Sequence, residues 1–258
     1  LIWLLIFLPL MGAIIQAAVG KSFIASMGPK QGRAWMGFLA VLPVAIAFFV
    51  ALGITLSLAG QPAESRVAIV KIFDWITLQN LSIPFELRVD PLSMTMALVV
   101  TGIGGLIHIF ATGYMADEPD YPRFFSYLNL FIVFMLTLVL GNNLALLFIG
   151  WEGVGLCSYL LIGFWYKDLN NSKAANKAFI VNRIGDVGLT LGIFYIAFIL
   201  AGNREVLGIT DPRWLSYDVI LPAAETIFKQ LPTETTIICL LLFVGAMGKS
   251  AQFPLYVW

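Results

Sequence analysis

Residues 150–165 read GWEGVGLCSYLLIGFW, and the interpretation of the whole chain starts from this stretch. It is apolar enough to lie in a lipid bilayer, yet Glu152 places a carboxylate near one end. A charged side chain at the centre of a membrane helix costs about 3 kcal/mol on insertion scales, so Glu152 is expected to face protein or water rather than lipid. An intramembrane carboxylate of this kind indicates a functional site.

The composition predicts a polytopic membrane protein. Of the 258 residues, 60% are hydrophobic and only 12% are charged, whereas charged residues make up about 25% of soluble domains. The formal net charge is zero. A chain with no excess of positive charge lacks the field that holds nucleic acid, so nucleic-acid binding is excluded.

Metal and haem chemistry within this chain is not expected. His108 is the single histidine, which excludes a bis-histidine haem. Cys157 and Cys239 lie far apart in apolar runs, without the clustering that a metal site requires. Any redox cofactor is therefore expected on another chain.

A membrane helix needs about 20 mostly apolar residues, and seven stretches satisfy this rule. We therefore predict an all-α, polytopic transmembrane helix bundle with a broken helix near Pro254. The predicted spans are residues 2–19, 34–59, 92–115, 124–141, 143–166, 175–201 and 235–258. The short basic segment 21–33 is expected to link the first two spans, and short surface helices are expected within 202–234.

Three regions follow from this pattern. Residues 1–60 form N-terminal membrane helices, 61–91 an extramembrane loop and 92–258 the helices that carry the buried charges. Within the loop, runs rich in Val, Ile, Phe and Trp flank Gln79-Asn80 and predict a β-hairpin turning there. Asp90-Pro91 then predicts a helix start, because it supplies an N-cap acceptor followed by proline at the first helical position.

The ends of the chain and the basic residues of its loops predict its extent and its orientation. The chain begins at Leu1 rather than Met and ends at Trp258 inside an apolar segment, so we expect it to be a piece of a longer protein. Basic residues in short loops mark the cytoplasmic side of a membrane protein. In the predicted topology these residues fall on one side: Lys21, Lys30, Arg33, Arg123, Lys167, Lys173 and Lys177.

Ionisable residues recur in the later spans. Arg183 precedes Asp186 by three positions, a spacing that suits an ion pair on one helix face. Lys249 lies deep in the last apolar run, five residues before Pro254, which breaks the helix. A buried lysine beside an interrupted helix is typical of transporter ion sites.

These groups suit proton transfer. Lysine and glutamate can both change charge inside a membrane, since burial moves their pKa values toward neutrality and each tunes the other. Glu152 and Lys249 are therefore the candidate proton-transferring groups, and Arg183 tunes Asp186, because arginine keeps its proton. His108 is a possible relay.

Structural roles are the alternative for each residue. The Arg183 and Asp186 pair could lock helices together, and His108 could be a packing residue that faces Thr101 or Thr112. Lys249 could extend its ammonium to the membrane interface.

Several motifs resemble one known family. They are WEGVGLCSYLLIGF (residues 151–164), NRIGD (182–186), GKSAQFPL (248–255), DPLS (90–93) and HIFATGYM (108–115). Their order and content are similar to those of the antiporter-like subunit L, or chain 5, family of proton-translocating NADH:quinone oxidoreductase, respiratory complex I. The resemblance covers roughly residues 85–258.

The resemblance implies a membrane-arm subunit built from two inverted repeats, of which this chain holds most of the first. It implies that Glu152 and Lys249 form the central pair of a proton channel, with Arg183 and Asp186 as a charged pair beside it. The family's later relay residues would lie beyond Trp258. Its expected partners are other membrane-arm subunits, lipid and protons, with quinone, NADH, FMN and iron–sulfur clusters on other subunits.

Alternative functions remain open at this point. The same buried charges fit a subunit of a multisubunit Na⁺/H⁺ antiporter or of a membrane-bound hydrogenase. They also fit a non-translocating structural subunit whose charges only hold helices together. The expected location is the bacterial inner membrane, with the mitochondrial inner or thylakoid membrane as alternatives.

Overall fold

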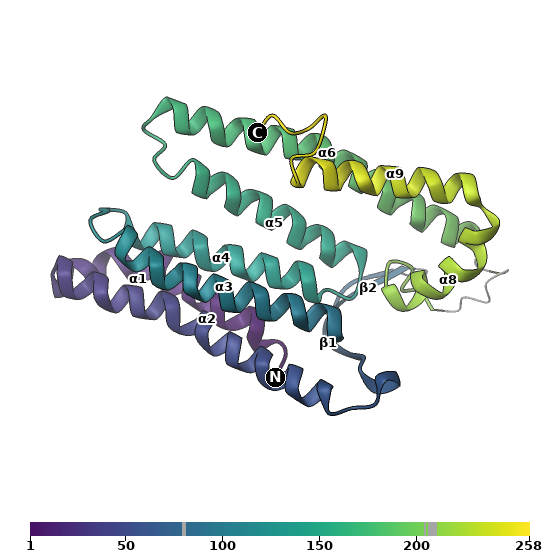
Figure 1. The fold of residues 1–258 in the computed structure, drawn as a ribbon, viewed down its shortest axis with the longest axis horizontal. Helices are drawn as coiled ribbons and strands as arrows, with labels where there is room; N and C mark the ends of the chain where they lie inside the picture. Colours follow the sequence, from purple (N-terminus) through teal and green to yellow (C-terminus); the bar gives the residue numbers. More distant parts are fainter. Residues whose placement is uncertain (79–80, 204, 206–210) are drawn as a thin grey trace. The chain divides into compact units, whose positions relative to one another are not determined.

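The computed structural model describes residues 1–78, 81–203, 205 and 211–258. Its helices and strands follow one another along the chain as shown in Figure 1. They are α1 (Leu4–Met27), α2 (Pro29–Ala59), β1 (Ala68–Leu78), β2 (Leu81–Val89), α3 (Pro91–Tyr114), α4 (Tyr121–Leu140), α5 (Leu144–Ile162), α6 (Leu169–Gly202), α8 (Tyr217–Gln230) and α9 (Pro232–Lys249).

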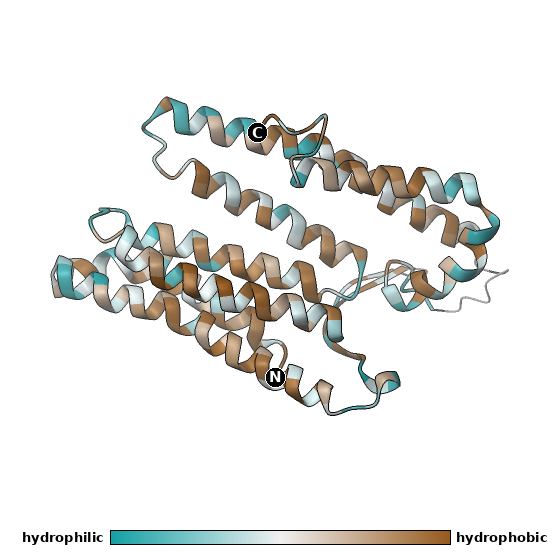
Figure 2. Cartoon of the chain, viewed as in Figure 1, coloured by the Kyte–Doolittle hydropathy of each residue, from teal (hydrophilic) through white to brown (hydrophobic). Residues whose placement is uncertain are grey.

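Seven of these helices are long and apolar enough to cross a membrane, and α8 is the short surface helix among those described. This confirms the predicted all-α bundle. Hydrophobic residues dominate the long helices, while hydrophilic residues gather at helix ends and connections (Figure 2). Two paired strands, β1 and β2, lie where the hairpin was predicted, although the turn at residues 79–80 falls outside the described residues.

The chain divides into two compact units. The first unit holds α1 to α4 and most of α5, and the second holds α6, α8, α9 and most of the two-stranded sheet. The first comprises Leu1–Val70, Leu87–Gly141 and Ile149–Phe164, and the second comprises Lys71–Glu86, Asn142–Phe148 and Trp165–Trp258.

In the first unit, α1 packs on α2 and α4, and α3 packs on α2 and α4. Aromatic and sulfur-bearing side chains fill the core at one end, where Met36, Tyr121 and Phe125 are buried with Phe164. Arg123 joins α4 to the end of α5, because its Nη2 donates to the Phe164 carbonyl at 3.1 Å and its guanidinium lies over the Phe164 ring. These contacts fix the end of α5 that follows Glu152.

One residue separates α1 from α2, so the predicted 21–33 linker was wrong. The helix α1 continues to Met27 and α2 begins at Pro29. Gly28 makes the reversal at φ 83°, a conformation that glycine adopts without steric cost. Helix-forming residues on either side of a single glycine thus replace the expected loop.

The predicted start of α3 is confirmed. Asp90 Oδ1 accepts a hydrogen bond from the Ser93 backbone N–H at 2.8 Å, and Ser93 Oγ accepts one from the Asp90 N–H at 2.9 Å. Burial alone would raise the pKa of Asp90, but these hydrogen bonds and the neighbouring Arg88 guanidinium hold it below its ordinary value. The cap therefore begins α3 at Pro91.

An ion cluster organises the loops of the second unit. Arg213 donates to Asp211 Oδ2 at 2.6 Å and to Glu86 Oε2 at 3.3 Å. Asn142 Nδ2 donates to Glu86 Oε2 at 3.2 Å and to Asp218 Oδ2 at 3.1 Å. The cluster thereby ties the end of β2 and the turn before α5 to the start of α8.

Replacing Arg213 with glutamine is expected to destabilise the second unit. Glu86 is only 4% exposed, and a buried carboxylate that loses its cationic partner costs about 3 kcal/mol. The thermal unfolding midpoint of the full chain in detergent measures this. Arg66→Gln, which removes an arginine that bonds only nearby carbonyls in the described residues, serves as the control, and equal midpoints for both variants would contradict the prediction.

The same variant should also change the response to acid. The Arg213 guanidinium holds the pKa of Asp211 below its ordinary value of 3.8. A lowered folded-state pKa contributes stability that is complete above the unfolded pKa and is lost as pH falls through the folded pKa. The midpoint of the unmodified chain should therefore fall more steeply than that of Arg213→Gln between about pH 5 and pH 3.

Candidate functional site

Lys249 is the last residue of α9, and the helix ends five residues before Pro254. Ala251 takes a left-handed conformation at φ 50°, and the Gln252 N–H donates to the Met247 carbonyl at 3.0 Å. This pattern closes a helix C-terminus. The predicted break near Pro254 is confirmed, but the predicted span to residue 258 was too long, because the turn at Ala251 already ends the helix at Lys249.

The segment after Lys249 turns back on the helix end. Trp258 Nε1 donates to the Gly248 carbonyl at 2.9 Å. The carbonyls of the last helical turn have no partners within the helix, and they form its negative end. The Lys249 ammonium group therefore lies at the negative end of the α9 dipole, which stabilises its positive charge.

Glycines bring α9 into close contact with α6 beside Lys249. A Cβ added at Gly185 would lie 3.0 Å from Gly248 Cα, and one at Gly188 would lie 2.9 Å from the Leu241 carbonyl oxygen. Small residues at a membrane helix interface allow backbones to approach this closely. The two helices run side by side in Figure 1, so residues of α6 next to Gly185 lie near the end of α9.

Asp186 is one of these residues, and it is 6% exposed. Its Oδ2 lies 3.9 Å from Arg183 Nη1, one turn earlier on α6. The Arg183 guanidinium also lies over the Phe179 ring, 4.5 Å from the ring centroid. Because this ion pair joins two residues of a single helix, it does not itself lock α6 to another helix.

Lys249 completes a group of three charges. Asp186 and Arg183 both lie within electrostatic range of its partly buried ammonium, one attracting and one repelling it. The predicted residues Lys249, Asp186 and Arg183 are therefore brought together, in the second unit, at the contact between α6 and α9.

Asn182 belongs with this group, although it was not among the predicted site residues. It is 6% exposed, and its Oδ1 has no hydrogen-bond partner within the described part of the chain. Its backbone carbonyl lies against Gly248, since a Cβ added at Gly248 would be 3.4 Å from the Asn182 carbonyl oxygen. The sequence signal was its four-residue spacing from Asp186, which places both on one helix face.

Glu152 lies on α5 in the first unit and is partly buried. The neighbouring Gly150 and Gly153 pack against α4, where added Cβ atoms would collide with Leu138 and Phe134. By helical geometry Glu152 lies on the opposite side of α5 from these glycines. The carboxylate is therefore directed away from α4.

His108 is fully buried on α3, and its Nδ1 hydrogen-bonds the Gly104 carbonyl at 2.7 Å. The hydroxyls of Thr101 and Thr112, which were expected to face His108, each donate to a carbonyl of their own helix. With Nδ1 as the donor, Nε2 is an acceptor, and it has no partner among the described residues. His108 also lines an apolar cavity of about 240 Å³ between α3 and α4.

Two family models match the sequence. Residues 75–125 match the N-terminal part of NADH-ubiquinone oxidoreductase (complex I) chain 5. Residues 141–258 match the transmembrane region described as NADH:quinone oxidoreductase/Mrp antiporter. The second match contains Glu152, the α6 charges and Lys249.

Curated relatives agree with these models. NADH-quinone oxidoreductase subunit L of Mycobacterium tuberculosis is 41% identical over 256 residues, covering 99% of this chain and 37% of the relative. The Escherichia coli K12 subunit L is 38% identical over 257 residues, covering 99% of this chain and 38% of the relative. Chain 5 of NADH-ubiquinone oxidoreductase from Triticum aestivum is also 38% identical, covering 99% and 36%. The chain thus spans a little over a third of the length of these relatives.

Solved structures share the fold. The Mrp complex from Dietzia sp. DQ12-45-1b superposes with a TM-score of 0.69 at 22% identity, covering 98% of this chain and 24% of that chain. An archaeal membrane-bound sulfane sulfur reductase superposes with a TM-score of 0.71 at 19% identity, covering 99% and 35%. Together with the seven membrane-length helices among the described residues, the family models and the curated relatives identify an integral, multi-pass membrane protein. The chain belongs to the family of antiporter-like membrane subunits found in NADH:quinone oxidoreductase and Mrp antiporters.

Proposed function

We propose that this chain carries protons as part of a membrane-arm subunit of NADH:quinone oxidoreductase. The supporting observation is the group formed by Lys249, Asp186 and Arg183 at the close contact of α6 and α9. Its members differ in chemistry, because lysine can exchange a proton while arginine keeps its charge. Such a group can hold or release a proton when the distances between its charges change.

In the proposed cycle, Lys249 and Arg183 compete for the carboxylate of Asp186. When Asp186 lies close to Lys249, its carboxylate favours the protonated ammonium, and Arg183 opposes it. Movement of Asp186 toward Arg183 leaves the ammonium with a like charge nearby and favours release of its proton. Asn182 Oδ1 can accept a hydrogen bond from a water molecule. Such a water molecule could receive the proton that leaves Lys249.

Glu152 is the proposed partner of Lys249 in proton transfer. Glutamate can take up a proton from water and pass it on. The Glu152 side chain lies on the side of α5 that is turned away from α4. Quinone reduction on other subunits would drive the cycle, and NADH, FMN, quinone and iron–sulfur clusters would bind there. Protons, lipid and the other membrane-arm subunits are the proposed partners of this chain.

Replacing Glu152 with glutamine tests the proposal. Glutamine keeps the size and hydrogen-bonding capacity of the side chain but cannot transfer a proton, so proton translocation per NADH oxidised should fall while the complex still assembles. A pH-sensitive dye in proteoliposomes measures the translocation, and native gel electrophoresis measures assembly. Glu225→Gln, on the exposed face of α8, is the control. Full translocation in Glu152→Gln would favour the non-translocating structural role instead.

The transported ion has a second candidate, because the matching family model also describes Mrp antiporters. A sodium/proton exchanger would change its proton flux when sodium is omitted. The same proteoliposomes, prepared with potassium as the only alkali cation, distinguish the two. Proton translocation that requires sodium would favour the antiporter assignment.

A further inference from the structure

A groove of about 650 Å³ lies in the first unit between the beginning of α2 and the end of α3. The lining of this α2–α3 groove includes Lys30, Arg33, Phe38, Val41, Ile109 and Gly113. We propose that the α2–α3 groove binds one membrane glycerophospholipid, with the phosphate at Lys30 and Arg33 and an acyl chain along Phe38, Val41 and Ile109. This site shares no residue with the charged group on α6 and α9.

The mouth of the groove carries the charges that recognise a phosphate. Arg33 Nη1 donates to the Ala116 carbonyl at the end of α3, which holds the guanidinium in place. Arginine has five N–H donors, so donors remain for phosphate oxygens, and Lys30 adds a second cation. Asp117 also lines the mouth, which leaves one net positive charge to meet the single negative charge of a phosphodiester.

The start of α2 adds to this attraction. Lys30 and Pro29 occupy its first turn, where backbone N–H groups lack partners within the helix. These groups and the helix dipole favour an anion at a helix N-terminus. The two side chains and the helix end therefore point to the same ligand chemistry.

The groove becomes apolar along α2 and α3, away from its charged mouth. Phe38 is 52% exposed and Ile109 is 56% exposed, and both line it together with Val41. Eight residues separate Arg33 from Val41, which is about 12 Å along a helix. A charged mouth followed by an apolar wall of this length matches a phosphate followed by an acyl chain.

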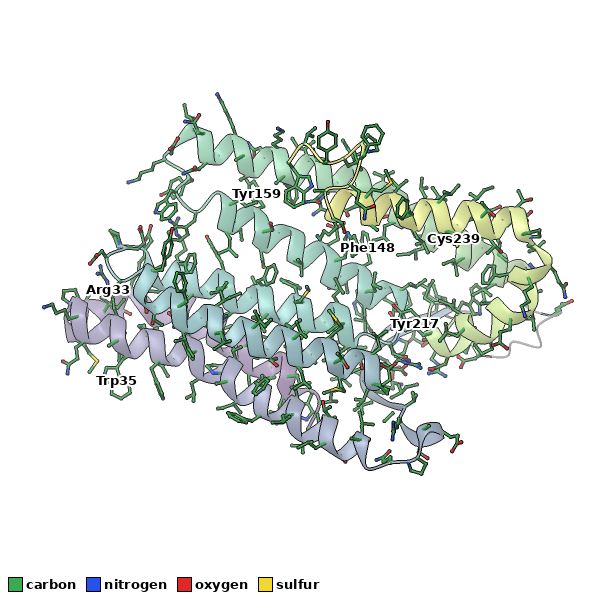
Figure 3. The ribbon with its side chains drawn as sticks, viewed as in Figure 1. Arg33, Trp35, Phe148, Tyr159, Tyr217 and Cys239 are labelled. Carbon is green, nitrogen blue, oxygen red and sulfur yellow. The ribbon has the colours of Figure 1, made fainter. Side chains whose placement is uncertain are left out.

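The length of α2 agrees with a phosphate at Lys30 and Arg33 and an acyl chain further along the helix. Helix α2 has 31 residues, which is about 46 Å, whereas the hydrocarbon core of a bilayer is about 30 Å thick. Because Lys30 and Arg33 are charged and lie in its first turns, that end of the helix is the one expected in the headgroup region. Trp35, 49% exposed, lies on the same end of α2 as Arg33 (Figure 3), and tryptophan is enriched at the membrane interface.

Glycine positions supply matched variants for a test. Gly113 lines the groove, and a Cβ added there meets nothing within 4 Å. Gly113→Leu should therefore place a side chain in the groove, because its first added atom meets open space. Gly53, which also has open space around it and lies on α2 outside the groove, provides the control Gly53→Leu.

Photocrosslinking in nanodiscs tests the proposal. The full chain in its native membrane complex is reconstituted in phosphatidylcholine containing phosphatidylglycerol with a diazirine on one acyl chain. Mass spectrometry of peptides then locates the label. We expect labelling within residues 34–41 and 109–116, removed by excess unlabelled phosphatidylglycerol but not by soluble glycerol 3-phosphate.

The variants separate this site from ordinary lipid contact. The double variant Lys30→Gln with Arg33→Gln should lower the labelling about tenfold, because it loses charge-assisted contacts with the phosphate. Gly113→Leu by itself should lower the labelling to a similar extent, because it removes the space for the acyl chain. Arg66→Gln and Gly53→Leu should label as the unmodified protein does. Unchanged labelling in Gly113→Leu, equal competition by glycerol 3-phosphate, or absence of label in the unmodified complex would each overturn the proposal.

Discussion

Replacing Lys249 with alanine is expected to lower proton movement through this chain about a hundredfold while the complex still assembles. Alanine cannot hold a proton, and removal of a proton-transferring side chain lowers a rate by about a hundredfold. Proton translocation and NADH oxidation should be measured together in proteoliposomes. Lys229→Ala, in the exposed last turn of α8, is the control for the loss of a lysine elsewhere in the second unit.

Lys249→Arg distinguishes proton transfer from a fixed charge. Arginine keeps the positive charge beside Asp186 but does not release its proton at any pH that the protein tolerates. If Lys249 transfers protons, the arginine variant should lose translocation as the alanine variant does. Normal translocation in Lys249→Arg would instead assign the lysine a purely electrostatic or structural role.

Replacing Gly185 with leucine is expected to separate α6 from α9. A single added Cβ would already lie 3.0 Å from Gly248 Cα and 3.1 Å from the Val244 carbonyl oxygen. Both neighbours are backbone atoms, which cannot rotate away as a side chain can. Overpacking of this kind costs about 3 kcal/mol, so the thermal midpoint and the yield of assembled complex should both fall.

Gly202→Leu is the matched control for this change. Gly202 ends the same helix, and a Cβ added there meets nothing within 4 Å. Its substitution should leave assembly and thermal stability near those of the unmodified chain. If Gly185→Leu proves equally stable, the close contact of α6 and α9 contributes little to the fold.

The sequence was sufficient for the features that depend on composition and local spacing. Seven apolar runs predicted the seven membrane-length helices found in the described part of the chain, because length and hydropathy alone decide whether a segment can span a bilayer. The three-residue spacing of Arg183 and Asp186 predicted an ion pair on one face of α6, and Arg183 Nη1 lies 3.9 Å from Asp186 Oδ2. The start of α3 at Asp90 was equally readable, since an N-cap acceptor followed by proline is a local signal.

Other features depend on contacts between distant residues. Arg213 and Glu86 are 127 positions apart, and no local pattern indicates that they meet. The bond from His108 to Gly104 was missed because a glycine offers only its backbone carbonyl, which the side-chain pattern does not show. The end of α9 at Lys249 depends on the left-handed conformation of Ala251, which alanine rarely adopts.

The single-residue junction at Gly28 has a consequence for biogenesis. With α1 ending at Met27 and α2 beginning at Pro29, no loop is long enough to let one helix integrate into the bilayer far from the other. A short basic turn also resists translocation across the membrane, and Lys21, Lys30 and Arg33 lie around this one. The two helices should therefore leave the translocon as a helical hairpin, with Gly28 retained on the side of synthesis.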